Sequence, residues 1–561
     1  GRIGGIVARY GMQGTYLESH ENGRTFVGDG MALKESATVP QSAIWMHDSP
    51  SGSKVPMAMA DIRESASVAH IWGQNIAAAE SFTASGRSER AYTYCPENIK
   101  YVADVAMSCG LNRFVVHESA SQPSDDVFPG TGLFNYGQWF NRHETWAPFA
   151  GAWTSYLSRS CNVLQAGRFV SDILFYYGED NCITGLYGHG LPGMPDGYAW
   201  DFINADGLLN MVEAVDGKLI TKSGMSYSVL VLGENCRKMS IRVLRRICAL
   251  AAAGVTVCGT VPEEAAGLSD DPAEFQALKD FIWTLPTVRT APAAEVIAEL
   301  EKDFTSTSAD MKYVHRSLPD GTDIYWVRNF SGFPGEVTMT FRSAHRKAFV
   351  MHPENGRIEG VQVSERDGRA VVTVPMTAAD AVFVVLHSSA AEYAPAPPAA
   401  EETVLEIEGP WSVAFQEKRG APAEATFPAL VSFTENPDPG IKYFSGIAVY
   451  TKVFRLSARD AGSVRALDLG SVKNVAEVRL NGQLLGIVWR EPFVVDGEAL
   501  RGALRKGENT LEIRVANLWR NRIIGDEQPG AQKITSTPDR FYTASSPLLP
   551  SGLLGPVRLL K

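Results

Sequence analysis

Short apolar runs alternate with helix-like stretches through the first 205 residues, and this alternation constrains the fold more than any other feature. The runs IAAAE (76–80), FVVHE (114–118) and ILFYYGE (173–179) each follow a helix-like segment. Continuous apolar strands that alternate with helices predict a parallel sheet covered on both faces. Functional side chains of such sheets gather at the carboxyl ends of the strands. The candidates at that edge are Glu80, His117, Glu118, Glu179 and Asp180.

The composition narrows the class of protein. A chain of 561 residues is long enough for about three to five domains that each bury a core. Its 63 acidic and 52 basic residues give a net charge of −11, which argues against a nucleic-acid or anionic-membrane surface. No apolar run reaches the length of about 18 residues that a membrane-spanning helix needs. The seven cysteines form no CxxC pair and lie mostly in apolar surroundings, so we expect buried free thiols.

Beyond the first segment (1–205), the order of predicted strands and helices changes, and three further regions can be distinguished. Residues 206–308 predict a small parallel α/β domain, because SYSVLVLG and VTVCG flank a helical stretch. Residues 309–390 contain short β-branched runs separated by turn residues, which predict a β-sandwich. A Pro/Ala linker (391–403) has no apolar periodicity, and residues 404–561 predict a second β-sandwich. Within it, Asn-Gly between two alternating runs in VAEVRLNGQLLGIVW is typical of a β-hairpin.

The carboxylates at strand ends are the first candidates for chemistry. Glu80 lies in the apolar context IAAAESF, where a charge is costly unless it is paired, metal-bound or used in catalysis. An equally open interpretation is that Glu80 orients another side chain. Glu118 has the same strand-end position, and His117 beside it is either functional or a satisfied core histidine. Glu179 either faces the same edge or caps the next segment.

Two segments, QWFNRHETWAPFAGAW (138–153) and GYAWDFIN (197–204), combine aromatic with polar side chains. Such side chains suit a wall on which a sugar stacks, and they equally suit a helix start or strand packed in a core. The chain contains no GxSxG, HExxH, P-loop, EF-hand loop or strand-linked GxGxxG, so a carboxylate-based hydrolase is the enzyme class that remains. The residues of the two segments are Trp139, Arg142, His143, Trp146, Trp153, Trp200, Asp201 and Asn204.

Several segments carry a family resemblance. They are HIWGQNIAAAESFT, LNRFVVHESASQP, FNRHETWAPFAGAWTSYLSRSCNVLQAGRFVSDILFYYGED and GYAWDFIN. In order and spacing they resemble the back half of the catalytic barrel of glycoside hydrolase family 106, whose members are α-L-rhamnosidases. The resemblance continues through SGMSYSVLVL and ends in VRLNGQLLGIVWREPFVVD, ANLWRNRIIGDEQ and LPSGLLGPVRL, which are typical of a C-terminal galactose-binding-like sandwich.

The resemblance implies a multidomain α/β plus β fold: part of a (β/α)8 barrel, a small α/β domain, a β-sandwich and a galactose-binding-like jelly roll. It also implies an inverting hydrolysis assisted by a calcium ion near the sugar hydroxyls. Inversion needs an acid on the leaving oxygen and a base on a water, about 6.5–9.5 Å apart. Glu80 matches the family position of the general base. The residues implied as sugar-pocket groups are Glu64, His70, His117, Glu118, Gln122, Trp139 and Arg142.

The chain departs from the family pattern in two places. VPQSAIWMH has Ser42-Ala43 where an acidic residue is expected, and HESASQP lacks the second histidine of HTFVHQP. The family's general acid comes from a strand before residue 1, and a (β/α)8 barrel needs about 200 residues or more. We therefore expect a chain that lacks the front of the catalytic region and cleaves natural glycosides poorly by itself. Of its own upstream carboxylates, Glu18 is the best acid candidate, ahead of Glu21, Asp29 and Glu35.

The sequence thus predicts an α-L-rhamnosidase-like glycoside hydrolase that removes terminal rhamnosides from poly- or oligosaccharides with paired carboxylates. We expect it to be secreted, periplasmic or on the cell surface, because polymeric substrates rarely enter the cytoplasm. No protein partner is predicted. Two alternatives remain open: a β-galactosidase- or glucuronidase-like hydrolase of the same architecture, and a non-catalytic carbohydrate-binding protein without a complete acid–base pair.

Overall fold

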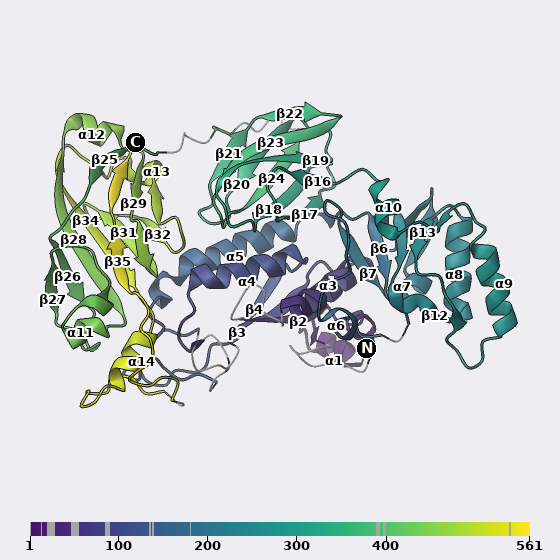
Figure 1. The fold of residues 1–561 in the computed structure, drawn as a ribbon, viewed down its shortest axis with the longest axis horizontal. Helices are drawn as coiled ribbons and strands as arrows, with labels where there is room; N and C mark the ends of the chain where they lie inside the picture. Colours follow the sequence, from purple (N-terminus) through teal and green to yellow (C-terminus); the bar gives the residue numbers. More distant parts are fainter. Residues whose placement is uncertain are drawn as a thin grey trace. The chain divides into compact units, whose positions relative to one another are not determined.

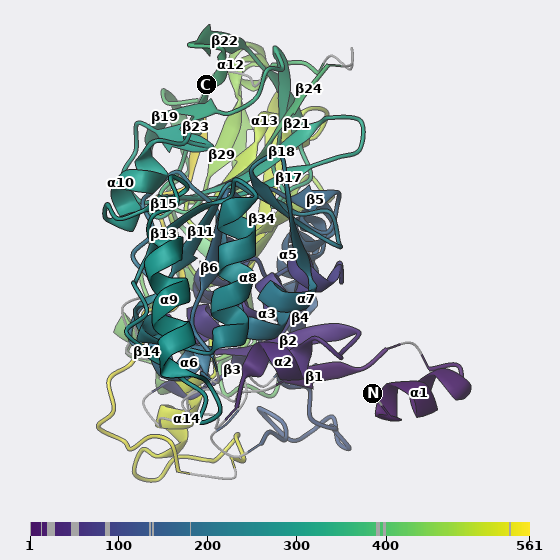
Figure 2. The ribbon, with the colours of Figure 1, turned by 90° about the vertical axis from the view of Figure 1, so that its right-hand side faces the viewer.

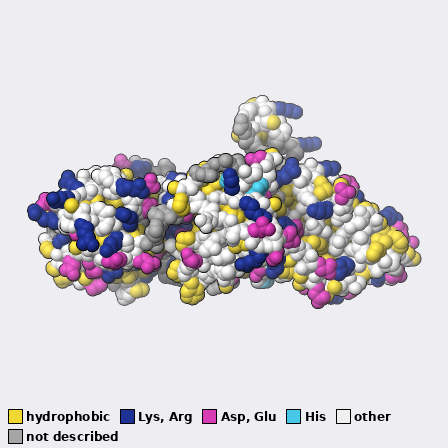
Figure 3. Space-filling view, turned by 90° about the horizontal axis from the view of Figure 1, so that it is seen from above, with side chains coloured by type: hydrophobic (Ala, Val, Ile, Leu, Met, Phe, Trp, Pro, Cys, Tyr) yellow, Lys and Arg dark blue, Asp and Glu magenta, His cyan; other side chains and the backbone are white. Residues whose placement is uncertain are grey.

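The computed structural model describes residues 2–12, 14–18, 28–46, 55–84, 90–133, 136, 140–179, 181–388, 393–395, 400–537 and 540–561. They form two compact units, the first from residues 1–81, 103–115 and 158–396 and the second from residues 82–102, 116–157 and 397–561. No helix within the described ranges is long and apolar enough to cross a membrane. Charged side chains of both signs are scattered over the face shown in Figure 3, as the mixed composition leads one to expect.

The first unit opens with a four-stranded sheet whose strands follow chain order. Its β3 and β4 confirm the strands predicted at 76–80 and 114–118, whereas the sequence did not predict β1 and β2. Its β1 and β2 pair in parallel. In the described residues this sheet stays open, with β1 and β4 as its edges, and no closed barrel is formed. The elements are α1 (Arg2–Arg9), β1 (Tyr16–Glu18), α2 (Gly30–Lys34), β2 (Val39–Trp45), α3 (Val55–Trp72), β3 (Ala78–Thr83), α4 (Pro96–Ser108), β4 (Arg113–Val116) and α5 (Ala150–Leu164).

A second sheet of the first unit is five-stranded and parallel, in the order β15-β13-β11-β6-β7. Helices α8 and α9 lie side by side over it (Figures 1 and 2). The sheet takes in β6 and β7, so the boundary expected at residue 205 lies too late for this domain. Continuous apolar runs suit any buried parallel strand, and they do not say which sheet a strand joins. The bounds are β6 (Ile173–Tyr176), β7 (Trp200–Ile203), β11 (Val229–Leu232), β13 (Thr256–Gly259), β15 (Val288–Arg289), α8 (Ile241–Ala252) and α9 (Pro272–Ile282).

Smaller elements complete this α/β region. The strands β8 (Val212–Val215), β9 (Lys218–Thr221) and β10 (Ser226–Tyr227) form a three-stranded sheet, and β12 (Lys238–Met239) pairs with β14 (Glu264–Ala265). The helices are α6 (Ile183–Tyr187), α7 (Ala205–Asn210) and α10 (Ala293–Ala298). All seven cysteines are free, as predicted, and Cys95, Cys109, Cys236 and Cys258 are buried.

The predicted middle β-sandwich is present and packs two sheets around one apolar core, in the orders β16-β19-β23-β22 and β21-β20-β24-β18-β17-β5. Its first strand begins at Phe304, and β5 joins it from far upstream. The linker expected at 391–403 lies largely outside the described residues. The bounds are β5 (Arg168–Phe169), β16 (Phe304–Ser306), β17 (Met311–Ser317), β18 (Asp323–Asn329), β19 (Gly335–Phe341), β20 (Lys347–Met351), β21 (Ile358–Val361), β22 (Val363–Arg366), β23 (Arg369–Met376) and β24 (Ala381–His387).

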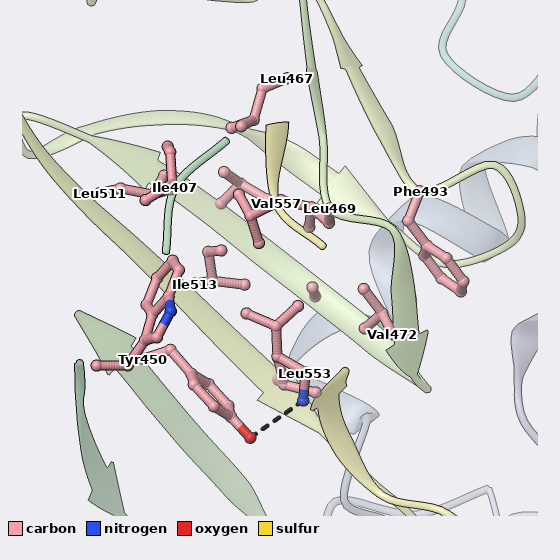
Figure 4. Close-up of a cluster of buried hydrophobic side chains, with 14 of the residues drawn as sticks. Ile407, Tyr450, Leu467, Leu469, Val472, Phe493, Leu511, Ile513, Leu553 and Val557 are labelled. Atoms are coloured by element: carbon pink, nitrogen blue, oxygen red, sulfur yellow. Dashed lines mark hydrogen bonds between the residues drawn. The ribbon is translucent and has the colours of Figure 1, made fainter. Parts of the chain in front are cut away.

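The second unit contains the C-terminal sandwich, with sheets in the orders β27-β26-β28-β34-β31-β32 and β25-β36-β29-β33. In its core Tyr450 Oη accepts a hydrogen bond from the Leu553 amide at 3.0 Å (Figure 4). The predicted hairpin is confirmed: β31 and β32 meet at Asn481 and Gly482, whose φ angles of 52° and 82° suit a tight primed turn.

The remaining bounds of the sandwich are β25 (Thr403–Glu406), β26 (Trp411–Phe415), β27 (Glu424–Phe427), α11 (Pro439–Lys442), β28 (Ile447–Leu456), α12 (Ala458–Ser463), β29 (Ala466–Asp468), β30 (Ser471–Lys473), β31 (Val475–Leu480), β32 (Gln483–Val488), β33 (Val494–Asp496), α13 (Gly497–Leu500), β34 (Gly507–Ala516), α14 (Arg520–Asp526), β35 (Gly552–Gly555) and β36 (Arg558–Leu560).

Candidate active site

Glu80 lies on β3 and is the one position of that strand that is not buried. Its neighbours Ala79 and Ser81 are both 0% exposed, and the Ser81 hydroxyl donates to the Ala79 carbonyl at 2.8 Å. Two residues further on, Phe82 has a φ of 71°, a left-handed conformation that is costly for a bulky side chain and is often found beside functional sites. Glu80 is therefore the half-buried position of an otherwise buried strand, and a base that takes a proton from a water cannot be fully buried.

The Ser42-Ala43 pair on the neighbouring strand β2 holds the sheet together. Ser42 and Ala43 are 0% and 1% exposed. The Ser42 hydroxyl donates to the Ala78 carbonyl of β3 at 3.0 Å, and the Ala43 amide donates to Asp61 Oδ2 of α3 at 2.9 Å. These contacts connect β2 to its neighbours, and neither side chain faces solvent.

Glu64 lies in a buried ion cluster. It is 1% exposed, and Lys34 Nζ lies 2.8 Å from its Oε1 and 2.7 Å from Asp61 Oδ1. Burial disfavours the charged form of Lys34, but the two carboxylates outweigh it and hold the pKa of Lys34 above its ordinary value. A Cβ at Gly30 would approach Glu64 Oε1 to 2.3 Å, so the cluster needs a glycine there. The Glu64 carboxylate is therefore already paired with Lys34. The sugar contact predicted for Glu64 stays a prediction.

His70, two turns further along α3, contacts the second sheet of the first unit. Its Nδ1 lies 2.9 Å from Asp201 Oδ1, and its ring stacks on Phe169 at 4.3 Å. Asp201 also accepts from the Ser67 hydroxyl at 3.0 Å and from the Tyr227 hydroxyl at 2.8 Å. Burial alone would raise the pKa of Asp201, but His70, the charge of Arg63 and the Tyr227 hydroxyl lower it. Asp201 thus connects α3 to β7, and no local sequence pattern indicated its partners.

The second unit contains the other predicted sugar contacts in the loop after β4. His117 and Glu118 are partly exposed, and His117 Nδ1 has no hydrogen-bond partner within the described part of the chain. The Gln122 amide closes the loop by accepting from the Thr131 amide at 2.8 Å and donating to the Thr131 carbonyl at 2.7 Å. Arg142 holds the same loop.

The Arg142 contacts are specific. Its Nε donates to Asp125 Oδ1 at 2.8 Å, and its Nη2 donates to the Gln122 carbonyl at 2.8 Å. Arg142 nevertheless leaves 52% of its side chain exposed. It is therefore the sugar-pocket candidate of this loop that is both held in place and accessible. Trp139 lies outside the described residues.

The aromatic cluster after this loop is a core. Trp146 and Trp153 are each 2% exposed, and Phe140 stacks on Trp153 at 5.7 Å with ring planes 5° apart. Trp146 Nε1 donates to the Tyr94 carbonyl at 3.2 Å. Of the two interpretations left open by the sequence, the packed helix start is confirmed for these tryptophans, because buried rings offer no face to a sugar.

The upstream carboxylates that the structure describes do not supply an obvious acid. Asp29 caps α2 and accepts from the Tyr177 hydroxyl at 2.7 Å and from Asn204 Nδ2 at 3.0 Å. Burial, followed by the charges of Asp206 and Asp29, raises the pKa of Glu35 to about 7, which would suit an acid.

Glu35 is nevertheless at the wrong end of the strands. Gln74, just before β3, donates to the Glu35 carbonyl at 3.3 Å and to the Ala37 carbonyl at 2.7 Å. This places Glu35 at the amino ends of β2 and β3, away from the carboxyl edge where such sheets carry their catalytic groups. Glu21 and the Glu18 side chain lie outside the described residues.

The family resemblance also implies a calcium ion. Within the described residues no three His, Cys, Asp or Glu side chains gather as a possible metal site. Glu179 is occupied by the backbone amide and hydroxyl of Ser240, at 2.6 and 2.8 Å, and so caps α8. Glu64 is paired with Lys34, and Asp180 lies outside the described residues.

The fold and the half-buried Glu80 fit the carboxylate-based hydrolases that the motifs left open, and comparison with known proteins identifies the family. The family model for alpha-L-rhamnosidase, glycoside hydrolase family 106, matches residues 1–365. The chain belongs to this family, as its segments predicted.

Two relatives show how far the likeness extends. A rhamnosidase from Novosphingobium sp. PP1Y is 36% identical and superposes with a TM-score of 0.90, over 100% of this chain and 54% of that one. A putative beta-glucuronidase from Formosa agariphila is 23% identical over 751 residues, which cover 88% of this chain and 63% of that protein. The chain therefore spans only between half and two thirds of the length of either relative.

Proposed function

We propose that this chain works in an α-L-rhamnosidase that hydrolyses terminal α-L-rhamnosides of oligo- or polysaccharides with inversion, and that Glu80 is the general base. One observation carries the proposal: in a chain of this family, Glu80 is the half-buried acidic residue of an otherwise buried strand. Family membership supports the reaction class, and the geometry of β3 supports the residue.

Inverting hydrolysis requires a general base and a general acid. A carboxylate takes a proton from a water while that water attacks the anomeric carbon from the face opposite the leaving group. An acid about 6.5–9.5 Å from the base protonates the departing oxygen. Glu80 is suited to the first task because it is an acidic residue that is not fully buried. The two described upstream candidates, Asp29 and Glu35, are not suited to the second, for the reasons of position and hydrogen bonding given above.

We further propose that β1–β4 are one part of a (β/α)8 barrel. Their chain-order arrangement with helices in the connections is what such a barrel repeats. The apolar residues Val115 and Val116 of the edge strand β4 are 39% and 41% exposed. Native proteins usually cover or pair an apolar edge strand, and a further barrel strand would do so. The rhamnosidase of known structure is nearly twice as long as the matched region, which leaves ample chain for further strands.

A panel of nitrophenyl glycosides tests the function. We expect turnover of the α-L-rhamnoside and release of the inverted anomer, seen by NMR immediately after cleavage. The second candidate, a β-glucuronidase, is favoured by the name of the Formosa agariphila relative and would show as preferential cleavage of the β-glucuronide. Rhamnoside binding without turnover of any panel member would instead support the non-catalytic carbohydrate-binding protein.

Two accompanying proposals concern a metal ion and the cellular location of the enzyme. The family resemblance implies a calcium ion near the sugar, although the described residues provide no cluster for it. A polymeric substrate implies work outside the cytoplasm, which fractionation of expressing cells would test.

A further inference from the structure

The first unit has a solvent-connected cavity of about 410 Å³ that none of the candidate catalytic residues lines. Its walls come from α3, from the residues between α4 and β4, from the loop before β7, and from the first strands of the middle sandwich. Ser108 lies just before β4, and Tyr198 just before β7. The cavity therefore lies toward the amino ends of these strands, whereas catalytic groups of such sheets lie at the carboxyl ends.

The charges in this cavity favour an anion. The lining contains Arg63, Lys302 and Lys312 against Asp196 and Asp310. The pair of Lys312 with Asp196 is long, 3.7 Å, and exposed at both ends. Within the described residues, no carboxylate lies at ion-pair distance from Arg63 or Lys302.

Arg63 is also held in position for a ligand. Its Nη1 and Nη2 point to the carbonyls of Trp200 and Ser108 at 3.4 and 3.2 Å, and its guanidinium lies over the Trp200 ring at 5.1 Å. Its Nε is buried and has no hydrogen-bond partner among the residues that the structure describes. Buried donors usually have a partner, and this donor belongs to a cationic side chain on the wall of the cavity.

The rest of the wall is apolar and adaptable. Met59, Met194 and Met311 line it, and all three are partly exposed. Methionine side chains adapt to irregular surfaces, so they suit the C–H faces of a ring better than a bare inorganic ion, which offers no apolar surface. The cavity thus combines cations with an apolar wall, and an acidic sugar has both a carboxylate and apolar ring faces.

We propose that this cavity is a second saccharide-binding site, which takes a hexuronate-containing saccharide and is separate from Glu80. Arg63 and Lys302 bind the carboxylate, and the methionines contact the sugar ring. The choice of a saccharide rests on the proposed function, whereas the preference for an anion rests on the charges of the cavity alone. A second site of this kind would hold an acidic polysaccharide on the enzyme while a rhamnoside is cleaved elsewhere.

Isothermal titration with trigalacturonate, with maltotriose as the neutral match and with sodium sulfate as the bare anion, tests the proposal. We expect trigalacturonate to bind more tightly than either. Lys302→Glu should weaken it by about tenfold or more, the usual weight of a charge-assisted contact. The exposed Lys222, which does not line the cavity, provides the matched control Lys222→Glu, and this variant should bind like the wild type.

Three outcomes would overturn the proposal: no binding of trigalacturonate, equal loss in Lys302→Glu and Lys222→Glu, or equal affinity for sulfate. Arg63→Gln is a second variant, with its melting temperature measured because Arg63 also contacts two carbonyls. Binding does not require turnover, so the two proposals can fail separately. A chain that prefers another nitrophenyl glycoside but binds trigalacturonate through Lys302 would refute the rhamnosidase and keep the site, and a chain that cleaves the rhamnoside but ignores trigalacturonate would do the reverse.

Discussion

Glu80→Gln separates chemistry from folding at the scale of one residue. The amide keeps the shape of the side chain but cannot take a proton from water, so kcat on nitrophenyl α-L-rhamnoside should fall by about 100-fold or more. The melting temperature should change little, because Glu80 is only partly buried.

A surface carboxylate of the first unit, Glu336 on β19, provides the control. Glu336→Gln makes the same chemical change on an exposed strand position and should leave kcat unchanged. If Glu80→Gln retains more than about a third of the wild-type kcat, Glu80 has no part in the proton transfer.

Lys34→Met should destabilise the protein strongly. It would leave Glu64 and Asp61 buried without their cation, and breaking a buried ion pair costs about 3–5 kcal/mol. The free energy of unfolding from urea titration measures the loss. Adding Asp61→Asn and Glu64→Gln to Lys34→Met should recover part of it. No recovery would show that the cluster does not depend on charge.

At the scale of single elements, β17 and β18 contain a buried charged network. His315 is 3% exposed, and its Nδ1 and Nε2 lie 3.0 Å from Asp303 Oδ1 and 3.2 Å from Asp323 Oδ1. Its ring stacks on Tyr325 at 3.9 Å, and Arg342 lies 3.5 Å from the same Asp303. Burial lowers the pKa of His315, but the carboxylates of Asp303 and Asp323 outweigh burial and raise it to about 9.

This network predicts a loss of stability at alkaline pH. The folded pKa of His315 lies above the unfolded value of about 6.5, so its stabilisation is complete below that value and is lost as the pH rises through about 9. The full effect is about 3 kcal/mol. Urea unfolding at several pH values between 6 and 10 measures it. His315→Gln should remove this pH dependence, and a variant that still loses the same stability would assign it to other groups.

At the scale of the whole molecule, calcium dependence can be checked directly. If the family resemblance holds for the metal, exhaustive chelation should lower rhamnosidase activity, and added calcium should restore it better than zinc, because hard oxygen ligands favour calcium. Unchanged activity after chelation, together with no metal by elemental analysis, would contradict this prediction.

The leaving group offers another test of the whole chain. A nitrophenol departs without protonation, but the alcohol of a natural disaccharide needs an acid. Because Asp29 is occupied and Glu35 lies at the amino ends of the strands, residues 1–561 alone should cleave the nitrophenyl rhamnoside far better than a rhamnosyl disaccharide. Brisk disaccharide turnover that Glu18→Ala abolishes would identify an acid within this chain.

The sequence by itself determined the features that depend on neighbouring residues. The alternation of apolar runs and helices predicted the strands β3, β4 and β6, and the Asn481-Gly482 step predicted the β31–β32 hairpin. The alternation did not predict β1 and β2. Hydrophobic period and turn chemistry act over a few residues, so they can be read along the chain. The family was recognisable for the same reason, since its segments are continuous.

Only the tertiary structure decided which groups are occupied and which are accessible. Lys34 and Asp61 are 27 residues apart, and His70 and Asp201 are 131 apart. Their pairing depends on how α3 packs, which no local pattern reports. The same packing buried Trp146 and Trp153, assigned β6 and β7 to the second sheet, and left Glu80 only half-buried. Burial and charge pairing are properties of the packed chain, because both depend on contacts between residues far apart in sequence.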